Sequence, residues 1–124
     1  MSIVLGIIIK DAAGNKDLIF ASDGRTLEHK TKKIRNEDYD KIKRLGPTLC
    51  IGYAGSSEEL FEDVYTGLKS KIQNKPTMDL LFAASKLRAT ILETLEIPKH
   101  QEVEQYYGPL NHQFIIGGFY KSLR

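Results

Sequence analysis

The sequence predicts an α+β protein in which strands come first, two helices follow and a last strand closes the order. Residues 3–9 are rich in β-branched side chains, which favour a strand. After Gly55 the apolar residues recur at the spacing of an amphipathic helix. With 124 residues, the chain has the size of one domain. Because the helices follow the strands and do not alternate with them, we expect a sheet that carries a helical layer.

The amino-terminal half is expected to form two hairpins. Residues 3–9 form a strand buried on both faces, and the Gly, Asn and Asp residues after it turn into an antiparallel strand at residues 18–23. A polar segment follows, with one short extended piece near residues 32–35. The second hairpin spans residues 41–55, with its turn at residues 46–47.

The second half is expected to form two helices and a strand. Ser56 and Glu59 fit a capping box that begins the first helix just after Gly55. Residues 78–97 form the second helix, and their more apolar composition predicts that it is the more buried of the two. Residues 112–119 form the last expected strand.

Composition and charge exclude several classes of protein. Hydrophobic residues make up 41% and charged residues 27% of the chain, as is typical of globular proteins. A net charge of +2 does not indicate a nucleic-acid or membrane partner, and no apolar stretch approaches the roughly 20 residues of a transmembrane helix. Cys50 lies in an apolar stretch and is interpreted as a small buried side chain. With no disulfide framework and no secretory signal, the expected compartment is the cytoplasm.

The histidines and the basic segment do not indicate a ligand site. His29, His100 and His112 are scattered without ligand spacing, so we expect no metal and no cofactor. Residues 30–35 are basic, but the acidic residues after them neutralise this charge. We interpret the segment as a solvated loop and not as a phosphate site.

Two sequence blocks, taken in order, resemble a known family. The first is ASDGR at residues 21–25, in which a strand ends in a small residue and Asp, and Arg follows. The second runs from the Lys-Ile pair at Lys41 to the Ala-Gly pair that ends at Gly55, at the start of a helix. With HQFIIGG at residues 112–118, these blocks are similar to the β-type subunits of the proteasome and to the bacterial HslV peptidase, which are N-terminal nucleophile (Ntn) hydrolases.

The resemblance implies an αββα sandwich of which only the first part is present, with about four strands, two helices and one strand. Residues 1–124 would be a single proteasome-like Ntn-hydrolase domain that is incomplete at its carboxyl end, because family subunits continue beyond this strand. The implied activity is peptide-bond hydrolysis in a self-compartmentalising ring. The expected partners are a peptide or unfolded-protein substrate and the other subunits of a homo- or hetero-oligomeric ring, without nucleic acid or membrane.

The resemblance also assigns roles to five residues. Counting back from Gly6 places Ser2 at the nucleophile position, where removal of Met1 would expose its hydroxyl and a free α-amine. The hydroxyl attacks the scissile carbonyl and the amine takes the proton. Asp23 is assigned the role of holding a lysine, and Arg25 is the basic residue after it. Lys33 is assigned as the lysine that keeps the amine neutral, and the N–H of Gly55 as the donor that stabilises the oxyanion.

The lysine assignment depends on the length of a loop. The family position falls between Glu37 and Tyr39, where no lysine stands, and Lys32 and Lys33 lie a few residues earlier. A loop drawn differently would allow Lys33 to take the role.

The assigned residues also have plainer interpretations. Ser2 can be the usual small residue after an initiator Met, Asp23 an acceptor in a turn, and Arg25 a solvated side chain. Gly55 can be the backbone entry to a helix. A non-catalytic scaffold or assembly subunit of the same fold is therefore the alternative to a peptidase.

Overall fold

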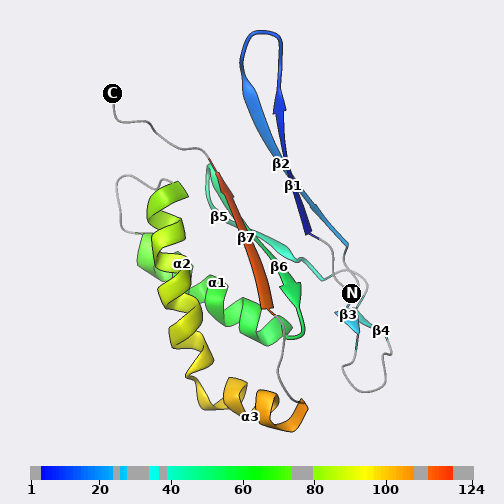
Figure 1. Ribbon diagram of the computed structural model, residues 1–124, viewed down its shortest axis with the longest axis vertical. Coiled ribbons are helices and arrows are strands. Elements are labelled where there is room, and N and C mark those ends of the chain that lie inside the picture. Colours follow the sequence, from blue (N-terminus) through cyan, green and yellow to red (C-terminus); the bar gives the residue numbers. More distant parts are fainter. Residues whose placement is uncertain are drawn as a thin grey trace.

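The strands of the protein come first and the helices follow, except for one last strand (Figure 1). The computed structural model describes residues 4–23, 39–73, 80–105 and 112–118, and the backbone alone of residues 26–27, 34–36 and 106–107. The elements are β1 (Val4–Lys10), β2 (Lys16–Ser22), β3 (Thr26–Leu27), β4 (Ile34–Asn36), β5 (Ile42–Gly46), β6 (Leu49–Gly55), α1 (Glu58–Ile72), α2 (Leu80–Leu95), α3 (Pro98–Tyr107) and β7 (His112–Gly118). The α+β class is as predicted.

All strand pairs in the described residues are antiparallel. β1 pairs with β2, β3 pairs with β4, and β6 lies between β5 and β7. The expected β5–β6 hairpin is present, but it turns at Pro47 and Thr48, one residue later than expected, because Gly46 is still part of β5.

The β1–β2 hairpin closes through a turn held by one aspartate. Both carboxylate oxygens of Asp11 accept hydrogen bonds from Asn15, one from the backbone N–H at 2.8 Å and one from the side-chain amide at 2.9 Å. Gly14 has a φ of 89°, a conformation that glycine adopts without strain. These are the residue types that predicted the hairpin.

The hydrophobic core lies between the three-stranded sheet and the helices α1 and α2. Ile51 and Tyr53 of β6 point into it from the sheet, and Phe61 and Leu68 of α1 meet them from the helix side. The rings of Tyr53 and Phe61 stack with centroids 5.1 Å apart. The apolar stripe that predicted α1 is therefore the face that packs on the sheet.

The other face of this sheet carries the β1–β2 hairpin, and glycines allow the close approach. A Cβ atom at Gly117 would lie 2.5 Å from the ring of Phe20, and one at Gly52 would lie 2.6 Å from Cγ1 of Val4. Any larger residue at either position would push the hairpin away from the sheet. The layers are thus hairpin, sheet and helices.

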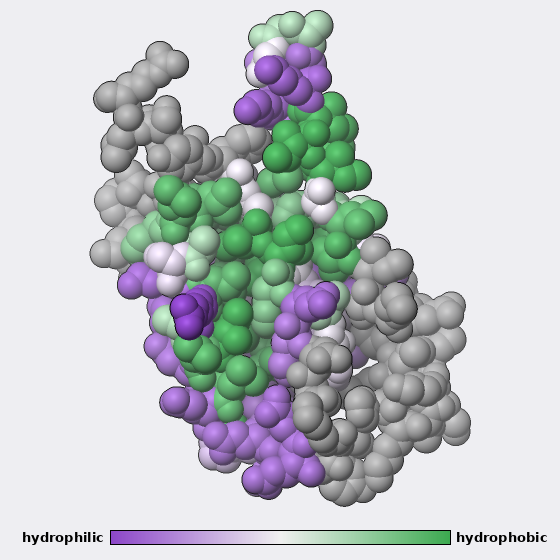
Figure 2. All heavy atoms as spheres, in the orientation of Figure 1, coloured by the Kyte–Doolittle hydropathy of each residue, from purple (hydrophilic) through white to green (hydrophobic). Residues whose placement is uncertain are grey.

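The expectation that the first strand is buried on both faces is wrong. The side chains of Ile7, Ile8 and Ile9 are 48%, 72% and 47% exposed. The hairpin extends beyond the sheet on which it packs, and among the described residues nothing covers its outer face (Figure 1). Apolar residues are visible on its middle part, with hydrophilic residues nearer the tip (Figure 2).

The expectation that the second helix is the more buried is also wrong. Five apolar residues of α1 are buried, whereas the buried residues of α2 are Ala83, Thr90 and Thr94. Leu81 and Leu92 of α2 are 59% and 54% exposed. The reason is position, since α1 contacts β5, β6 and α2, whereas α2 has an outer face that no other described element covers.

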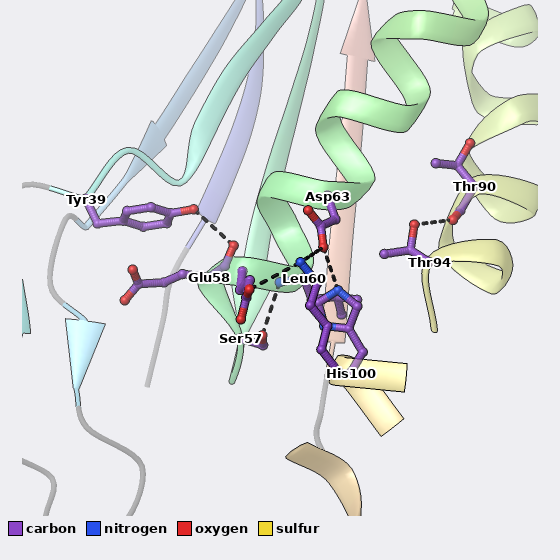
Figure 3. A network of polar contacts seen from close by, with 10 residues as sticks. Tyr39, Ser57, Glu58, Leu60, Asp63, Thr90, Thr94 and His100 are labelled. Atoms are coloured by element: carbon purple, nitrogen blue, oxygen red, sulfur yellow. Dashed lines mark hydrogen bonds and ion pairs between the residues drawn. The ribbon is translucent and has the colours of Figure 1, made fainter. Parts of the chain in front are cut away.

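Two further details differ from the expectations. The side chain of Ser57, and not that of Ser56, caps α1, because its Oγ accepts the N–H of Leu60 at 3.1 Å (Figure 3). The segment between α2 and β7, for which no helix was predicted, contains α3. Pro98 is its first residue, a position where proline suits a helix because its missing N–H is not needed.

Truncating the α1 face tests where the core lies. Leu68→Ala should lower the free energy of unfolding by about 2–5 kcal/mol, because Leu68 is fully buried. The matched Leu92→Ala should change it by less than about 0.5 kcal/mol, because Leu92 is half exposed. Urea titrations of both variants measure the difference, and equal effects would contradict this placement of the core.

Candidate active site

A buried ion pair joins the end of β2 to the start of β5. The Nζ atom of Lys41 lies 2.9 Å from Oδ1 of Asp23, and the Lys41 side chain is only 3% exposed. A buried ammonium group needs a counter-charge and hydrogen bonds, because its loss of hydration is otherwise very costly. The carboxylate of Asp23, 37% exposed, supplies both. This pair is the centre of the candidate site.

The backbone of Lys41 is fixed as well as its side chain. Its carbonyl oxygen accepts the N–H of Tyr53 on β6 at 2.9 Å. The ion pair is therefore attached to the central strand of the sheet through Lys41 and to the hairpin through Asp23.

The amino end of β1 lies beside the same pair. Val4 is the register partner of Ser22, the residue that precedes Asp23. Its side chain packs against Gly52, and the Lys41 carbonyl oxygen lies 3.7 Å from the Cβ position of that glycine. The start of β1, the end of β2 and the start of β5 therefore meet at one point of the fold.

Gly55 ends β6 two residues after Tyr53, on the same side of the strand. N–H groups two residues apart in a strand point to the same edge. Because the Tyr53 N–H donates to Lys41, the Gly55 N–H points toward the β5 edge and away from β7. It is a backbone donor aimed to the edge of β6 on which the backbone of Lys41 lies.

The structure describes two of the five assigned site residues, Asp23 and Gly55. Lys41 contacts both Asp23 and Tyr53, which lies two residues before Gly55. Ser2, Arg25 and Lys33 lie outside the described residues, so their roles stay predictions. The sequence reasoning used Lys41 only as a landmark of the second block. Its position at the first residue of an alternating strand pattern, directly before Ile42, was the available signal, but a lysine there is usually solvated.

A second polar cluster joins α1 to α3 (Figure 3). Nε2 of His100 lies 2.7 Å from Oδ2 of Asp63, and Nζ of Lys99 lies 2.8 Å from the same oxygen. Burial acts to raise the pKa of Asp63, but the hydrogen bonds from Lys99 and His100 outweigh it, and the pKa lies below its usual value. The cluster holds a carboxylate between two donors and positions α3 on α1.

Three other expectations can be compared with the described residues. Among them, no three His, Cys, Asp or Glu side chains are placed to hold a metal ion. Cys50 is half-buried, and burial raises the pKa of its thiol, so the neutral form dominates at pH 7. None of the helices in this part of the chain is both long and apolar enough to cross a membrane.

Comparison with known proteins does not assign the chain to a family. No protein-family model matches it, and no curated protein is significantly similar to it. The family therefore stays an expectation from the sequence blocks.

Removing the counter-charge of Lys41 tests the ion pair. Asp23→Asn should lower the free energy of unfolding by about 3 kcal/mol, because it leaves a buried ammonium group without its carboxylate. The matched Asp17→Asn, at an exposed position of β2, should change it by less than about 0.5 kcal/mol. Chemical denaturation of each variant gives these values.

Adding Lys41→Met to Asp23→Asn provides the control. The double variant should be more stable than Asp23→Asn alone, since it removes the buried charge that has lost its carboxylate partner Asp23. Additive losses from the two substitutions would show that the pair is not coupled.

Proposed function

We propose that the chain is a cytoplasmic proteasome-type Ntn-hydrolase subunit that cleaves peptide bonds with the hydroxyl of Ser2. The observation that carries the proposal is the buried Lys41–Asp23 pair beside the amino end of β1. An N-terminal nucleophile needs a cation held next to the α-amine, and a carboxylate that holds the cation. In this proposal Lys41 takes the lysine role that the sequence assigned to Lys33.

The distances along the chain support this assignment. Ser2 precedes Val4 by two residues, which span at most about 7 Å of backbone. Val4 itself pairs with Ser22 and packs against Gly52, next to the Lys41 carbonyl. The α-amine exposed by removal of Met1 therefore has a short path to the ammonium group of Lys41.

The proposed chemistry uses few groups. The Ser2 hydroxyl attacks the carbonyl carbon of the substrate while the neutral α-amine takes its proton. The C–N bond then breaks, and the leaving amine receives that proton, so that an ester to Ser2 remains and water hydrolyses it. Lys41 disfavours the protonated amine by charge repulsion, and Asp23 keeps Lys41 in place. The Gly55 N–H stabilises the negative oxygen of the tetrahedral intermediate.

The layers of the fold are compatible with the proposed sandwich. Helices α1 and α2, the β5–β6–β7 sheet and the β1–β2 hairpin lie in the order α, β, β. An αββα sandwich would place a further helical layer on the outer face of the hairpin, where Ile7, Ile9 and Ile19 are exposed. The proposed substrate is a peptide or an unfolded protein. Arg25 remains a proposed residue of the site.

A non-catalytic scaffold or ring subunit of the same fold is the second candidate. The exposed apolar face of the hairpin is compatible with this candidate as well as with the peptidase, because soluble monomers rarely leave contiguous apolar surface uncovered. Ile7 and Ile19 are register partners on this face and are 48% and 45% exposed. Both candidates predict self-association, so the amino terminus has to separate them.

Labelling of the amino terminus tests the peptidase. Intact mass should show loss of Met1, and a peptide epoxyketone, which reacts with a hydroxyl next to a free amine, should add once to the assembled protein. Ser2→Ala should abolish the adduct, whereas Ser56→Ala, at an exposed serine next to Gly55, should leave it unchanged. An assembled protein that keeps Met1, or that stays unlabelled, would contradict the peptidase and leave the scaffold.

Charge on the hairpin face tests the association that both candidates need. Ile7→Lys should shift the protein toward the monomer in sedimentation velocity, because the charge would have to be buried in the contact. Ala12→Lys, at the exposed hairpin turn, is the control and should sediment as the wild type does. A wild-type protein that is monomeric at all concentrations would contradict both candidates.

A further inference from the structure

A tyrosine and a histidine hold the turn that follows Gly55. The hydroxyl of Tyr53 lies 2.9 Å from Nδ1 of His112, and it accepts the backbone N–H of Ser57 at 3.0 Å. His112 begins β7 and is the register partner of Gly55. Both side chains are largely buried, with Tyr53 3% and His112 10% exposed.

The pattern of donors fixes where the protons are. The amide of Ser57 can only donate, so the Tyr53 oxygen accepts from it. The Tyr53 hydroxyl proton then needs an acceptor, and among the described residues Nδ1 of His112 lies within reach. His112 is therefore neutral and carries its proton on Nε2, which faces Oε1 of Glu104 at 3.8 Å.

The surroundings of both groups agree with this arrangement. Burial raises the pKa of Tyr53 to about 12 against the hydrogen bonds from the turn amides, so the hydroxyl keeps its proton. Burial also lowers the pKa of His112, and the charge of His100 acts in the same direction, while Glu104 opposes them.

The other groups around His112 are mostly uncharged. Ser57 and Leu60 of α1, Leu95 of α2 and Val103 of α3 line the same small pocket. Outside the pocket, Glu58 acts on the Tyr53 hydroxyl, and Asp63 binds His100. Among the described residues, Tyr53, Glu104 and His100 are thus the titratable groups that act on His112.

These contacts determine the direction of the Gly55 peptide. On one side, the Tyr53 N–H is bound to the Lys41 carbonyl. On the other, the Ser57 N–H is bound to the Tyr53 hydroxyl, and the Ser57 side chain caps α1. Gly55 lies between two fixed peptide groups, although it has no side chain to hold it.

We propose that Tyr53 and neutral His112 are positioning residues for the Gly55 N–H, and that protonation of His112 loosens the β6–α1 turn and slows turnover. The catalytic part of this inference depends on the proposed function. A charged His112 donates from Nδ1, so it cannot accept the Tyr53 hydroxyl proton. Either that proton loses its acceptor in a buried site, or the tyrosine turns away from Ser57.

The test uses the full chain and three substitutions. Tyr53→Phe keeps the ring in the core but removes the hydroxyl. His112→Asn places an amide oxygen near the position of Nδ1, where it accepts a hydrogen bond without titrating, whereas His112→Ala removes the acceptor. Tyr65→Phe is the matched control, because its hydroxyl donates to the Arg44 carbonyl at 2.8 Å, away from the turn.

Nuclear magnetic resonance gives the readouts that do not require activity. At pH 7.5 the ¹⁵N shifts of His112 should show the Nε2–H tautomer. Protection of the Ser57 amide from hydrogen exchange should fall roughly tenfold in Tyr53→Phe, as expected for one lost hydrogen bond, and not in Tyr65→Phe. Protection of the Ser57 amide should fall in the wild type as the pH drops below 6.5, and it should stay constant in His112→Asn. A charged or Nδ1–H ring at pH 7.5, or equal protection in the two tyrosine variants, would overturn the inference.

Stability should follow the same pH dependence. The folded-state pKa of His112 lies below its ordinary value of 6.5, so on acidification the unfolded chain takes up the proton first. The contribution of His112 to stability is therefore complete above about pH 6.5 and is lost as the pH falls toward the folded-state pKa. The pH dependence of unfolding should be shallower in His112→Asn than in the wild type, and equal slopes would contradict a neutral buried ring.

Peptide hydrolysis separates this inference from the proposed function. The value of kcat should fall roughly tenfold in Tyr53→Phe and His112→Ala with KM unchanged, and His112→Asn should restore it and remove the step in the pH profile below 6.5. Unchanged kcat in Tyr53→Phe would overturn the positioning role. If the wild type does not hydrolyse peptides, the proposed function fails, and the catalytic part of this inference fails with it. The hydrogen-exchange protection of the Ser57 amide still tests whether Tyr53 and His112 hold the β6–α1 turn.

Discussion

The ion pair between Lys41 and Asp23 is the constraint on which the arrangement of this fold depends. A buried ammonium group is costly without a counter-charge, and Asp23 supplies one, which places the end of β2 at the start of β5. The pair therefore fixes the β1–β2 hairpin on one face of the sheet, opposite the helices. Because Val4 pairs with Ser22, it also fixes where β1 begins. The same contact that joins the layers thus creates the polar centre of the candidate site.

Close packing on both faces of the sheet also holds the layers together. The absence of side chains at Gly52 and Gly117 lets Val4 and Phe20 lie directly on the sheet, and the core on the other face is closed by α1. The direction of the Gly55 N–H follows from the hydrogen bond that the Tyr53 N–H donates to the Lys41 carbonyl oxygen. The site is therefore built from the backbone of a packed strand and not from a loose loop, which suits a group that has to bind a developing charge.

The sequence predicted those features that local patterns determine. The stripe of apolar residues predicted the buried face of α1, and the Gly and Asp residues around Asp11 predicted the first hairpin. Burial of whole elements was harder, because composition does not tell which face another element covers. The apolar β1 and α2 both expose side chains for this reason. The helix α3 was missed because its polar residues lack periodicity, and Pro98 was its only signal. The Lys41–Asp23 contact depends on how the chain between them is folded, which counting along the sequence cannot supply.

The pKa of the α-amine of Ser2 is the sharpest test of the proposed site, which places Lys41 next to that group. A chain labelled with ¹⁵N-serine, from which Met1 has been removed, can be titrated by nuclear magnetic resonance. This placement of Lys41 predicts a pKa below the ordinary range of about 7.7–8.0 in the wild type, and a return toward that range in Lys41→Met. An α-amine with an ordinary pKa that does not respond to Lys41→Met, in a chain shown to be folded, would contradict it.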